Sequence, residues 1–199
     1  MGSDANRLRK KWQDYSGRNA EKAEHSFYDT FQLLFIDTEY EIRRNPNEFR
    51  DLYVNVPLSE QELSEIYKPD TPQTRHGVFP DYAIANKETN KTIYVEVKRQ
   101  DGWVEGGVRS DGRGNAHERS CKFFTPGLQN ELRLKGNLAD NILPFWVVFT
   151  GDITRDPCRV REVKLWYKGI PEHYFMWRNQ QNREPIIEHF LNYIKPLID

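Results

Sequence analysis

Residues 81–98 of the chain read DYAIANKETNKTIYVEVK, and this stretch decides the fold. Residues 81–85 have the composition of a β-strand, and the polar residues 86–91 that follow have the composition of a turn. Residues 92–98 then read as a second strand that returns along the first. Apolar and polar side chains alternate in this second strand with the period of two that is typical of strands. The stretch therefore predicts one β-hairpin.

The return strand carries two charged side chains close together. Because neighbouring residues of a strand point to opposite faces, Val95 and Val97 are expected to face a core. Glu96 and Lys98 then project side by side from the other face. Asp81 begins the first strand of the hairpin, so its carboxylate is expected to meet that of Glu96 across the strand pair.

This pattern predicts a metal-dependent hydrolytic site. Two carboxylates that lie close repel each other, and a hard divalent cation such as Mg²⁺ relieves the repulsion. A cation held in this way activates water and stabilises the charge that builds up on a phosphodiester. The adjacent lysine can orient or deprotonate that water. The candidate catalytic residues are therefore Asp81, Glu96 and Lys98, and Asp81 and Glu96 are the candidate ligands for Mg²⁺.

A glycine-rich and basic segment follows the hairpin. Five of the chain's 12 glycines lie between residues 102 and 114, and this density allows the backbone to approach a ligand closely. Residues 98–122 include six lysines or arginines and four aspartates or glutamates. A positive segment beside a metal site suits a surface that follows a nucleic-acid backbone.

Within this segment, residues 115–118 read as the start of a helix. Asn115 is a suitable N-cap, and Glu118 would then stand at the third helical position, as in a capping box. In one interpretation these two residues only cap the helix. In the other, the helix start points at DNA, where Arg113, Asn115 and Arg119 reach base edges. The two interpretations are compatible.

Together these motifs resemble those of the type II restriction endonucleases of the PD-(D/E)xK superfamily, in the branch that includes EcoRI and MunI. The resemblance begins at Pro80 and Asp81 and continues through residues 96–106, 112–122, 143–149, 151–157 and 174–178. The chain thus resembles the family across most of its second half, and more loosely in its first half.

The resemblance implies a fold, a reaction and a set of site residues. The implied fold is α/β, with a restriction-endonuclease-like core in which helices flank a mixed central β-sheet. The implied enzyme is a homodimer that uses Mg²⁺ to cut duplex DNA at the palindrome CAATTG and leaves 5′-AATT overhangs. In the cell it would have a companion DNA methyltransferase. Asp81, Glu96 and Lys98 match the catalytic positions of the family. The family's DNA-binding recognition segment matches Arg113, Gly114, Asn115, Ala116, His117, Glu118 and Arg119.

Composition sets further bounds. The chain has 199 residues, which predicts a single domain over residues 1–199. Its net charge is −1 at pH 7, so DNA binding would depend on local basic surfaces rather than on the whole chain. The two cysteines, Cys121 and Cys158, and the lack of a leader or membrane-length apolar run predict a cytoplasmic bacterial protein with free thiols. The sequence also lacks the spacings of a zinc site and of an ATP-binding phosphate loop.

Other segments predict the elements around the hairpin. They are an amphipathic helix over 21–36, a capped helix over 59–67, a buried strand over 145–149, another strand over 163–167 and a C-terminal helix over 185–194. Strands flanked by helices give an α/β sandwich with a mixed sheet. Glu24, on the first of these helices, either adds a carboxylate to the metal region or is solvated.

Three alternatives compete with a restriction endonuclease. A different metal-dependent DNA nuclease would share the hairpin but not the specificity, and the match over residues 113–119 argues against it. A non-catalytic DNA-binding protein would not need the intact set Asp81, Glu96 and Lys98. A hydrolase of small phosphoesters would not need the long basic glycine segment.

Overall fold

The structure is a computed structural model, and it describes residues 26–68, 70–71, 73–102 and 117–199. Its centre is a five-stranded sheet with the strand order β1-β2-β3-β4-β5. The strands are β1 (Tyr40–Arg44), β2 (Tyr82–Asn86), β3 (Lys91–Arg99), β4 (Phe145–Thr150) and β5 (Tyr174–Trp177). β1, β2 and β3 pair antiparallel, whereas β3, β4 and β5 pair parallel. The predicted mixed sheet is confirmed.

The predicted hairpin is formed by β2 and β3. Its turn is stabilised by Asn86, whose side-chain oxygen accepts hydrogen bonds from the backbone N–H groups of Glu88 (2.9 Å) and Thr89 (3.3 Å). Asn90 completes the turn in the left-handed conformation, with φ of 57°, which asparagine tolerates better than most residues. The strand β2 begins one residue later than predicted, and β3 is one residue longer at each end.

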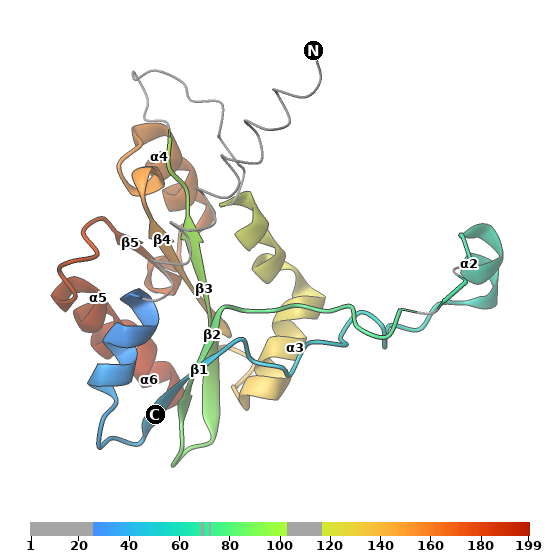
Figure 1. Cartoon of the computed structure of the whole chain (residues 1–199), viewed down its shortest axis with the longest axis horizontal. Coiled ribbons are helices and arrows are strands. Elements are labelled where there is room, and N and C mark those ends of the chain that lie inside the picture. The colour runs from blue at the N-terminus through green and yellow to red at the C-terminus, as the bar shows by residue number, and fades with distance from the viewer. Residues whose placement is uncertain (1–25, 69, 72, 103–116) are drawn as a thin grey trace.

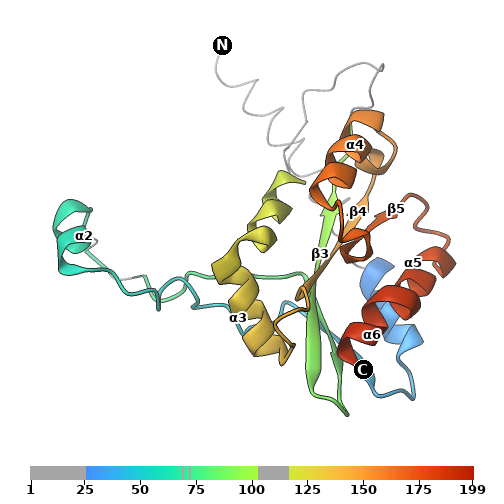
Figure 2. The same ribbon diagram turned by 180° about the vertical axis from the view of Figure 1, so that it is seen from behind.

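Helices cover both faces of the sheet, as Figures 1 and 2 show from opposite sides. One face is covered by a helix over residues 26–34 and by α5 (Glu184–His189), the π-helix η4 (Phe190–Ile194) and α6 (Lys195–Ile198). The other face is covered by the 3₁₀-helix η1 (Glu118–Phe124), α3 (Pro126–Gly136) and α4 (Pro157–Trp166). The remaining helices are α2 (Glu60–Glu65) and the 3₁₀-helices η2 (Asp152–Thr154) and η3 (Pro171–His173). β4 is therefore buried along its whole length, as its continuous apolar run predicts.

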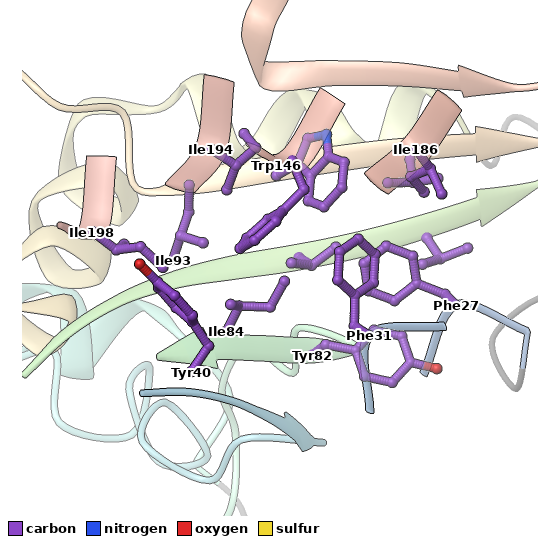
Figure 3. Packing of buried hydrophobic residues seen from close by; sticks show 14 of the residues in the cluster. Phe27, Phe31, Tyr40, Tyr82, Ile84, Ile93, Trp146, Ile186, Ile194 and Ile198 are labelled. Carbon is purple, nitrogen blue, oxygen red and sulfur yellow. The ribbon is translucent and has the colours of Figure 1, made fainter. Parts of the chain in front are cut away.

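Aromatic packing joins the helix over 26–34 to the sheet. The Phe31 ring is fully buried, and its centroid lies 4.7 Å from that of Phe27, 5.8 Å from that of Trp146 and 5.3 Å from that of Phe190. Figure 3 shows Phe27 and Phe31 packed with isoleucines from the sheet and the C-terminal helices. This cluster fixes one face of β3, so the catalytic candidates on that strand have a rigid support.

The chain between β1 and β2 leaves the sheet and carries α2 away from it in both views (Figures 1 and 2). We call residues 50–68 and 73–77 the arm. The two sides of the arm are joined near its base, where the backbone N–H of Tyr53 donates to the carbonyl of His76 (2.9 Å). α2 has the predicted capping box between Ser59 and Glu62 but no buried residue. The arm therefore exposes side chains that the sheet does not cover.

The predictions for the outer elements were partly right. The predicted helices over 59–67 and 185–194 are present as α2 and as α5 with η4, and the first helix is described only from residue 26. In the described residues, no helix is both long and apolar enough to cross a bilayer.

The strand predicted over residues 163–167 was wrong, because these residues belong to α4 and its C-cap. Asp156 caps this helix by accepting a hydrogen bond from the N–H of Cys158 (3.0 Å), with a proline in the first turn. Val163 and Tyr167 are buried, whereas Leu165 between them is 70% exposed. Burial at i and i+4 is the pattern of a helix, while a strand would bury the side chains at i, i+2 and i+4 together.

Candidate active site

Asp81 lies immediately before β2, where it is bonded to both neighbouring strands. Its backbone carbonyl accepts a hydrogen bond from the N–H of Asn45, just after β1 (3.0 Å). Its carboxylate oxygen Oδ2 accepts a hydrogen bond from the N–H of Val97 in β3 (2.7 Å). The side chain is thus turned toward β3 rather than away from the sheet, and its position is set by backbone groups that the sheet itself fixes.

Glu96 and Lys98 lie on β3 beside this carboxylate. Because Tyr82 pairs with Val95 in the antiparallel register, extending the register by one residue places Asp81 opposite Glu96. Glu96 is only 4% exposed, and its Oε1 accepts a hydrogen bond from Lys98 Nζ at 2.5 Å. The structure thus brings the three predicted catalytic residues together.

A second lysine approaches the same carboxylate from a helix. Lys122, in η1, places Nζ 3.8 Å from Glu96 Oε1. Its side chain is 38% exposed, compared with 17% for Lys98. Burying a carboxylate is costly unless it is paired, so the two ammonium groups explain how Glu96 is tolerated inside the sheet.

The donor set fits a Mg²⁺ ion. Glu96 Oε2 is buried and has no hydrogen-bond partner among the described residues, so one carboxylate oxygen there is available to a ligand. Asp81 stands across the strand pair. The described part of the chain contains no group of three or more histidine, cysteine, aspartate or glutamate side chains that suits a metal. Mg²⁺ is commonly held by one or two carboxylates together with waters and phosphate oxygens, which is the set these residues offer.

The chain after β3 is tied to the loop that follows β4. Backbone N–H of Gly102 donates to Asp152 Oδ2 (2.8 Å), and the N–H of Asp152 donates to Asp101 Oδ1 (3.3 Å). Gln100 is held from both sides, since its N–H donates to Thr150 O (3.2 Å) and its carbonyl accepts from Ile153 N–H (3.1 Å). The basic glycine segment therefore leaves β3 from a fixed point.

The recognition segment returns to the described part of the chain at His117. The His117 ring is fully buried, its Nδ1 lies 3.0 Å from Gln100 Oε1, and it stacks on Trp166 of α4 with a centroid distance of 5.4 Å. Burial lowers the pKa of His117, and the positive charge of Arg159 lowers it further. The ring is thus neutral at physiological pH and is enclosed by protein rather than presented at the surface.

Around η1, every third side chain is buried, and the charged neighbours of His117 lie on the other side of the helix. His117, Ser120 and Phe123 are all buried, which is the three-residue repeat of a 3₁₀-helix. Glu118 and Arg119 fall on the exposed side of the same helix. Of the predicted recognition segment, these are the two described side chains that are open to a DNA molecule.

Four other residues of the recognition segment, Arg113, Gly114, Asn115 and Ala116, lie outside the described residues, as does Glu24. The predicted capping box needs a correction at its described end. The structure starts η1 at Glu118, with His117 at the N-cap and no side-chain capping bond. Glu118 is therefore the first helical residue and not the third.

Sequence reasoning missed the contacts that Lys122, Asp152 and Glu162 make at the site. Lys122 reaches Glu96 only because η1 packs over β3, and Asp152 contacts Gly102 only because β4 lies beside β3. Glu162 lies on α4, in the region that was predicted to lead into a strand, and its Oε2 is 3.3 Å from His117 Nε2. These contacts join residues far apart in the sequence, and no local motif signals them.

Substitution of Gly151 tests whether the site depends on the fixed end of β3. Gly151 has φ of 82°, and a Cβ there would lie 2.4 Å from Asp101 Oδ1 and 2.8 Å from Gln100 O. Gly169 has φ of 92° but nothing within 4 Å of its Cβ position. Both alanine variants carry a backbone strain of about 1–3 kcal/mol, but only Gly151→Ala pushes the end of β3. We expect Gly151→Ala to unfold at lower urea concentration than Gly169→Ala and to lose the predicted hydrolysis of DNA, which Gly169→Ala should retain. Equal cleavage by the two variants would show that the site does not depend on this contact.

Comparison with known proteins agrees with the geometry of the site. A family model described as the type II restriction enzyme MunI matches residues 1–199. A curated type II restriction enzyme MunI from Mycoplasma sp is 47% identical to the chain over 202 residues, which cover 100% of both proteins. The crystal structure of MunI restriction endonuclease in complex with cognate DNA matches with a TM-score of 0.80 and 47% identity, and the match covers 94% of this chain and 97% of that one. The carboxylate–lysine hairpin thus occurs in a chain that belongs to the MunI family of type II restriction endonucleases.

Proposed function

We propose that this restriction endonuclease hydrolyses both strands of duplex DNA at the palindrome CAATTG, uses Mg²⁺ and leaves 5′-AATT overhangs. The observation that carries the proposal is the pair of carboxylates on adjacent strands, with two lysines at Glu96. The target sequence rests on the resemblance of residues 113–119 to the recognition segment of the family. The relative that was crystallised with its cognate DNA supports duplex DNA as the substrate.

The residues of the hairpin divide the chemistry between them. Asp81 and Glu96 would hold the ion, which when bound stabilises charge on the phosphate and makes bound water more acidic. Lys98 is held beside Glu96 (2.5 Å), where its ammonium group can orient the attacking water and place positive charge near the scissile phosphate. Lys122 is more exposed and adds a second positive charge at the edge of the site.

The recognition segment supplies specificity in this proposal. Arginine pairs with the O6 and N7 acceptors of guanine, and asparagine pairs with adenine. We propose that Arg113 reads the guanine of the outer C·G pair, while Asn115 and Arg119 hold the inner A·T pairs. The exposure of Arg119 on η1 supports its part of this assignment.

Two alternatives remain distinct from this proposal. A PD-(D/E)xK nuclease with another target would cut DNA at a different sequence, and a non-catalytic DNA-binding protein would not cut at all. Glu96 is buried and paired with Lys98. Burying a charged pair stabilises a fold little or not at all, so the presence of this pair favours a working catalytic site.

A homodimer is part of the proposal, because a palindrome is read by two copies related by a two-fold axis. The arm supports a contact between copies. Its exposed large apolar residues are Tyr53, Val54, Val56, Leu58, Leu63, Ile66 and Tyr67. Apolar surface that the protein's own fold leaves uncovered commonly marks a protein interface, and the acidic Glu60 and Glu62 of α2 make DNA an unsuitable partner for its tip.

We further propose that residues 1–199 act as one domain, that the enzyme works in the bacterial cytoplasm and that a companion DNA methyltransferase protects the host sites. The family match over the whole chain supports the first point. The second is supported by the cysteines, since Cys121 and Cys158 are both free thiols.

Digestion of DNA of known sequence tests the reaction. With Mg²⁺, we expect the wild type to convert a plasmid that has one CAATTG site to a single linear product with 5′-AATT ends, and EDTA should stop the reaction. Asp81→Ala and Glu96→Ala should abolish cleavage because each removes a metal ligand, while both variants still bind CAATTG duplex. The measurement is gel analysis of products beside a binding titration. An Asp81→Ala protein that cuts at a rate near the wild type would refute the assignment.

Specificity at the outer base pair has its own test. Arg113→Lys keeps the positive charge but loses the planar fork that fits guanine, and one bidentate contact gives about 1–3 kcal/mol of discrimination. We expect the variant to retain attraction to DNA and to lose preference for CAATTG over sites altered only at the outer pair. Competition binding measures this preference. A preference equal to that of the wild type would show that Arg113 binds a phosphate or no DNA group.

Sedimentation velocity tests the role of the arm. We expect the wild type to sediment as a dimer and the double variant Leu63→Glu, Ile66→Glu to sediment as a monomer, because both changes place charge in the proposed contact. Leu33→Glu is the matched control, since Leu33 is 59% exposed on the helix over 26–34 and Leu63 is 55% exposed on α2. A double variant that remains dimeric would place the contact elsewhere.

A further inference from the structure

A polar cluster surrounds the buried His117, where the recognition segment meets the sheet. It consists of His117, Gln100 after β3, and Arg159, Glu162 and Trp166 on α4. His117 Nδ1 is 3.0 Å from Gln100 Oε1, and His117 Nε2 is 3.4 Å from Arg159 Nη1 and 3.3 Å from Glu162 Oε2. The planes of the His117 and Trp166 rings differ by 10°. The imidazole is thus held at both nitrogens and along one face.

The hydrogen bonds of this cluster run in series. Nδ1 of His117 is bonded to the side-chain amide of Gln100, and Nε2 lies against both the Arg159 guanidinium and the Glu162 carboxylate. Arg159 Nη1 in turn donates to both carboxylate oxygens of Glu162 (2.8 and 2.5 Å). Burial alone would raise the pKa of Glu162, but the bond and charge of Arg159 lower it. The cluster is therefore a continuous chain of bonds from α4 to the end of β3.

The residues at the two ends of this series of bonds belong to different parts of the proposed mechanism. Gln100 is two residues after Lys98 on the same backbone, and its own N–H and C=O groups are bonded to the region around the end of β4. His117 directly precedes Glu118 and Arg119, the exposed residues of the recognition segment. The bond between His117 and Gln100 thus connects the chain just after β3 with the start of η1, which also contacts β3 through Lys122 and Glu96.

We propose that His117 and Gln100 are positioning residues, and that their hydrogen bond makes cleavage depend on correct base recognition. The inference rests on the proposed function. When the recognition segment is seated on its correct sequence, the bond holds the end of β3 in register with the DNA. When the sequence is wrong, displacement of His117 weakens or breaks this bond, and the end of β3 loses that support. Small displacements of reacting groups are enough for this, since a shift of about 1 Å can cost on the order of a hundredfold in rate.

Changes at Gln100 test the bond without emptying the buried histidine site. Gln100→Leu keeps the size of the side chain but removes the acceptor, whereas Gln100→Glu keeps an acceptor facing Nδ1. Gln129→Leu is the matched control. Gln129 is also half-buried, and its Oε1 accepts one comparable bond, from Arg133 (3.0 Å), on α3 away from the site. Single-turnover cleavage is measured on CAATTG and on sites with one altered base pair, with thermal unfolding recorded for every variant.

We expect Gln100→Leu to cut CAATTG about tenfold more slowly or worse, and to have a smaller ratio of cognate to altered-site rates than the wild type. Gln100→Glu should recover most of both quantities, and Gln129→Leu should match the wild type. A Gln100→Leu enzyme with the wild-type ratio overturns the inference, whether its rate is unchanged or lowered. If Gln100→Leu does not fold, Gln100→Asn takes its place, because its side chain is one methylene shorter and moves the acceptor away from His117. The ratio of cognate to altered-site rates is then measured for this variant in the same way. A wild type that fails to cut CAATTG refutes the proposed function instead, and the ratio is then measured on the sequence that it does cut.

Discussion

The structure depends on the cost of keeping a charged carboxylate inside a covered sheet. β3 has a neighbour on each side and helices over both faces, yet it carries Glu96 at 4% exposure. An isolated buried charge would be expelled or neutralised. Lys98 and Lys122 supply compensating charge at Oε1, and Oε2 has no hydrogen-bond partner in the described part of the chain. Oε2 of Glu96 is therefore available to a cation. The compensating lysines come from β3 and from helix η1, so both elements are needed to form the site.

The fold serves this site by fixing the ends of the parallel strands. The chain leaves β3 beside the loop that follows β4, where Gly102 is bonded to Asp152 and where Gly151, at positive φ, has no Cβ that would clash with Asp101. The aromatic cluster around Phe31 packs against β3 on the sheet face that η1 does not cover. Both described ends of the segment that is proposed to read DNA are therefore held against the sheet, at Gly102 and at His117. A rigid scaffold that positions functional residues on its connecting segments is common in proteins.

Much of the fold and the centre of the site could be predicted from the sequence, because their signals are local. The alternation of apolar and polar residues over 92–98 predicted which side chains of β3 face the core. The polar turn predicted the hairpin that places Asp81 opposite Glu96. The strand predicted over 163–167 failed because a short apolar run does not distinguish a strand from one face of a helix. Lys122 and Glu162 could not be predicted, since their contacts arise only when η1 and α4 pack on the sheet. The bases proposed for Arg113 and Asn115 follow from the resemblance and from pairing chemistry, because both residues lie outside the described part of the chain.

The central claim is that Asp81 and Glu96 hold one divalent cation together. Calorimetric titration of Ca²⁺ into the protein bound to CAATTG duplex measures this most directly, because Ca²⁺ takes the same oxygen ligands as Mg²⁺ and is expected to bind without cleavage. The account predicts one site per chain in the wild type and loss of that binding in both Asp81→Asn and Glu96→Gln, with DNA affinity retained. Wild-type Ca²⁺ affinity in either variant would contradict it.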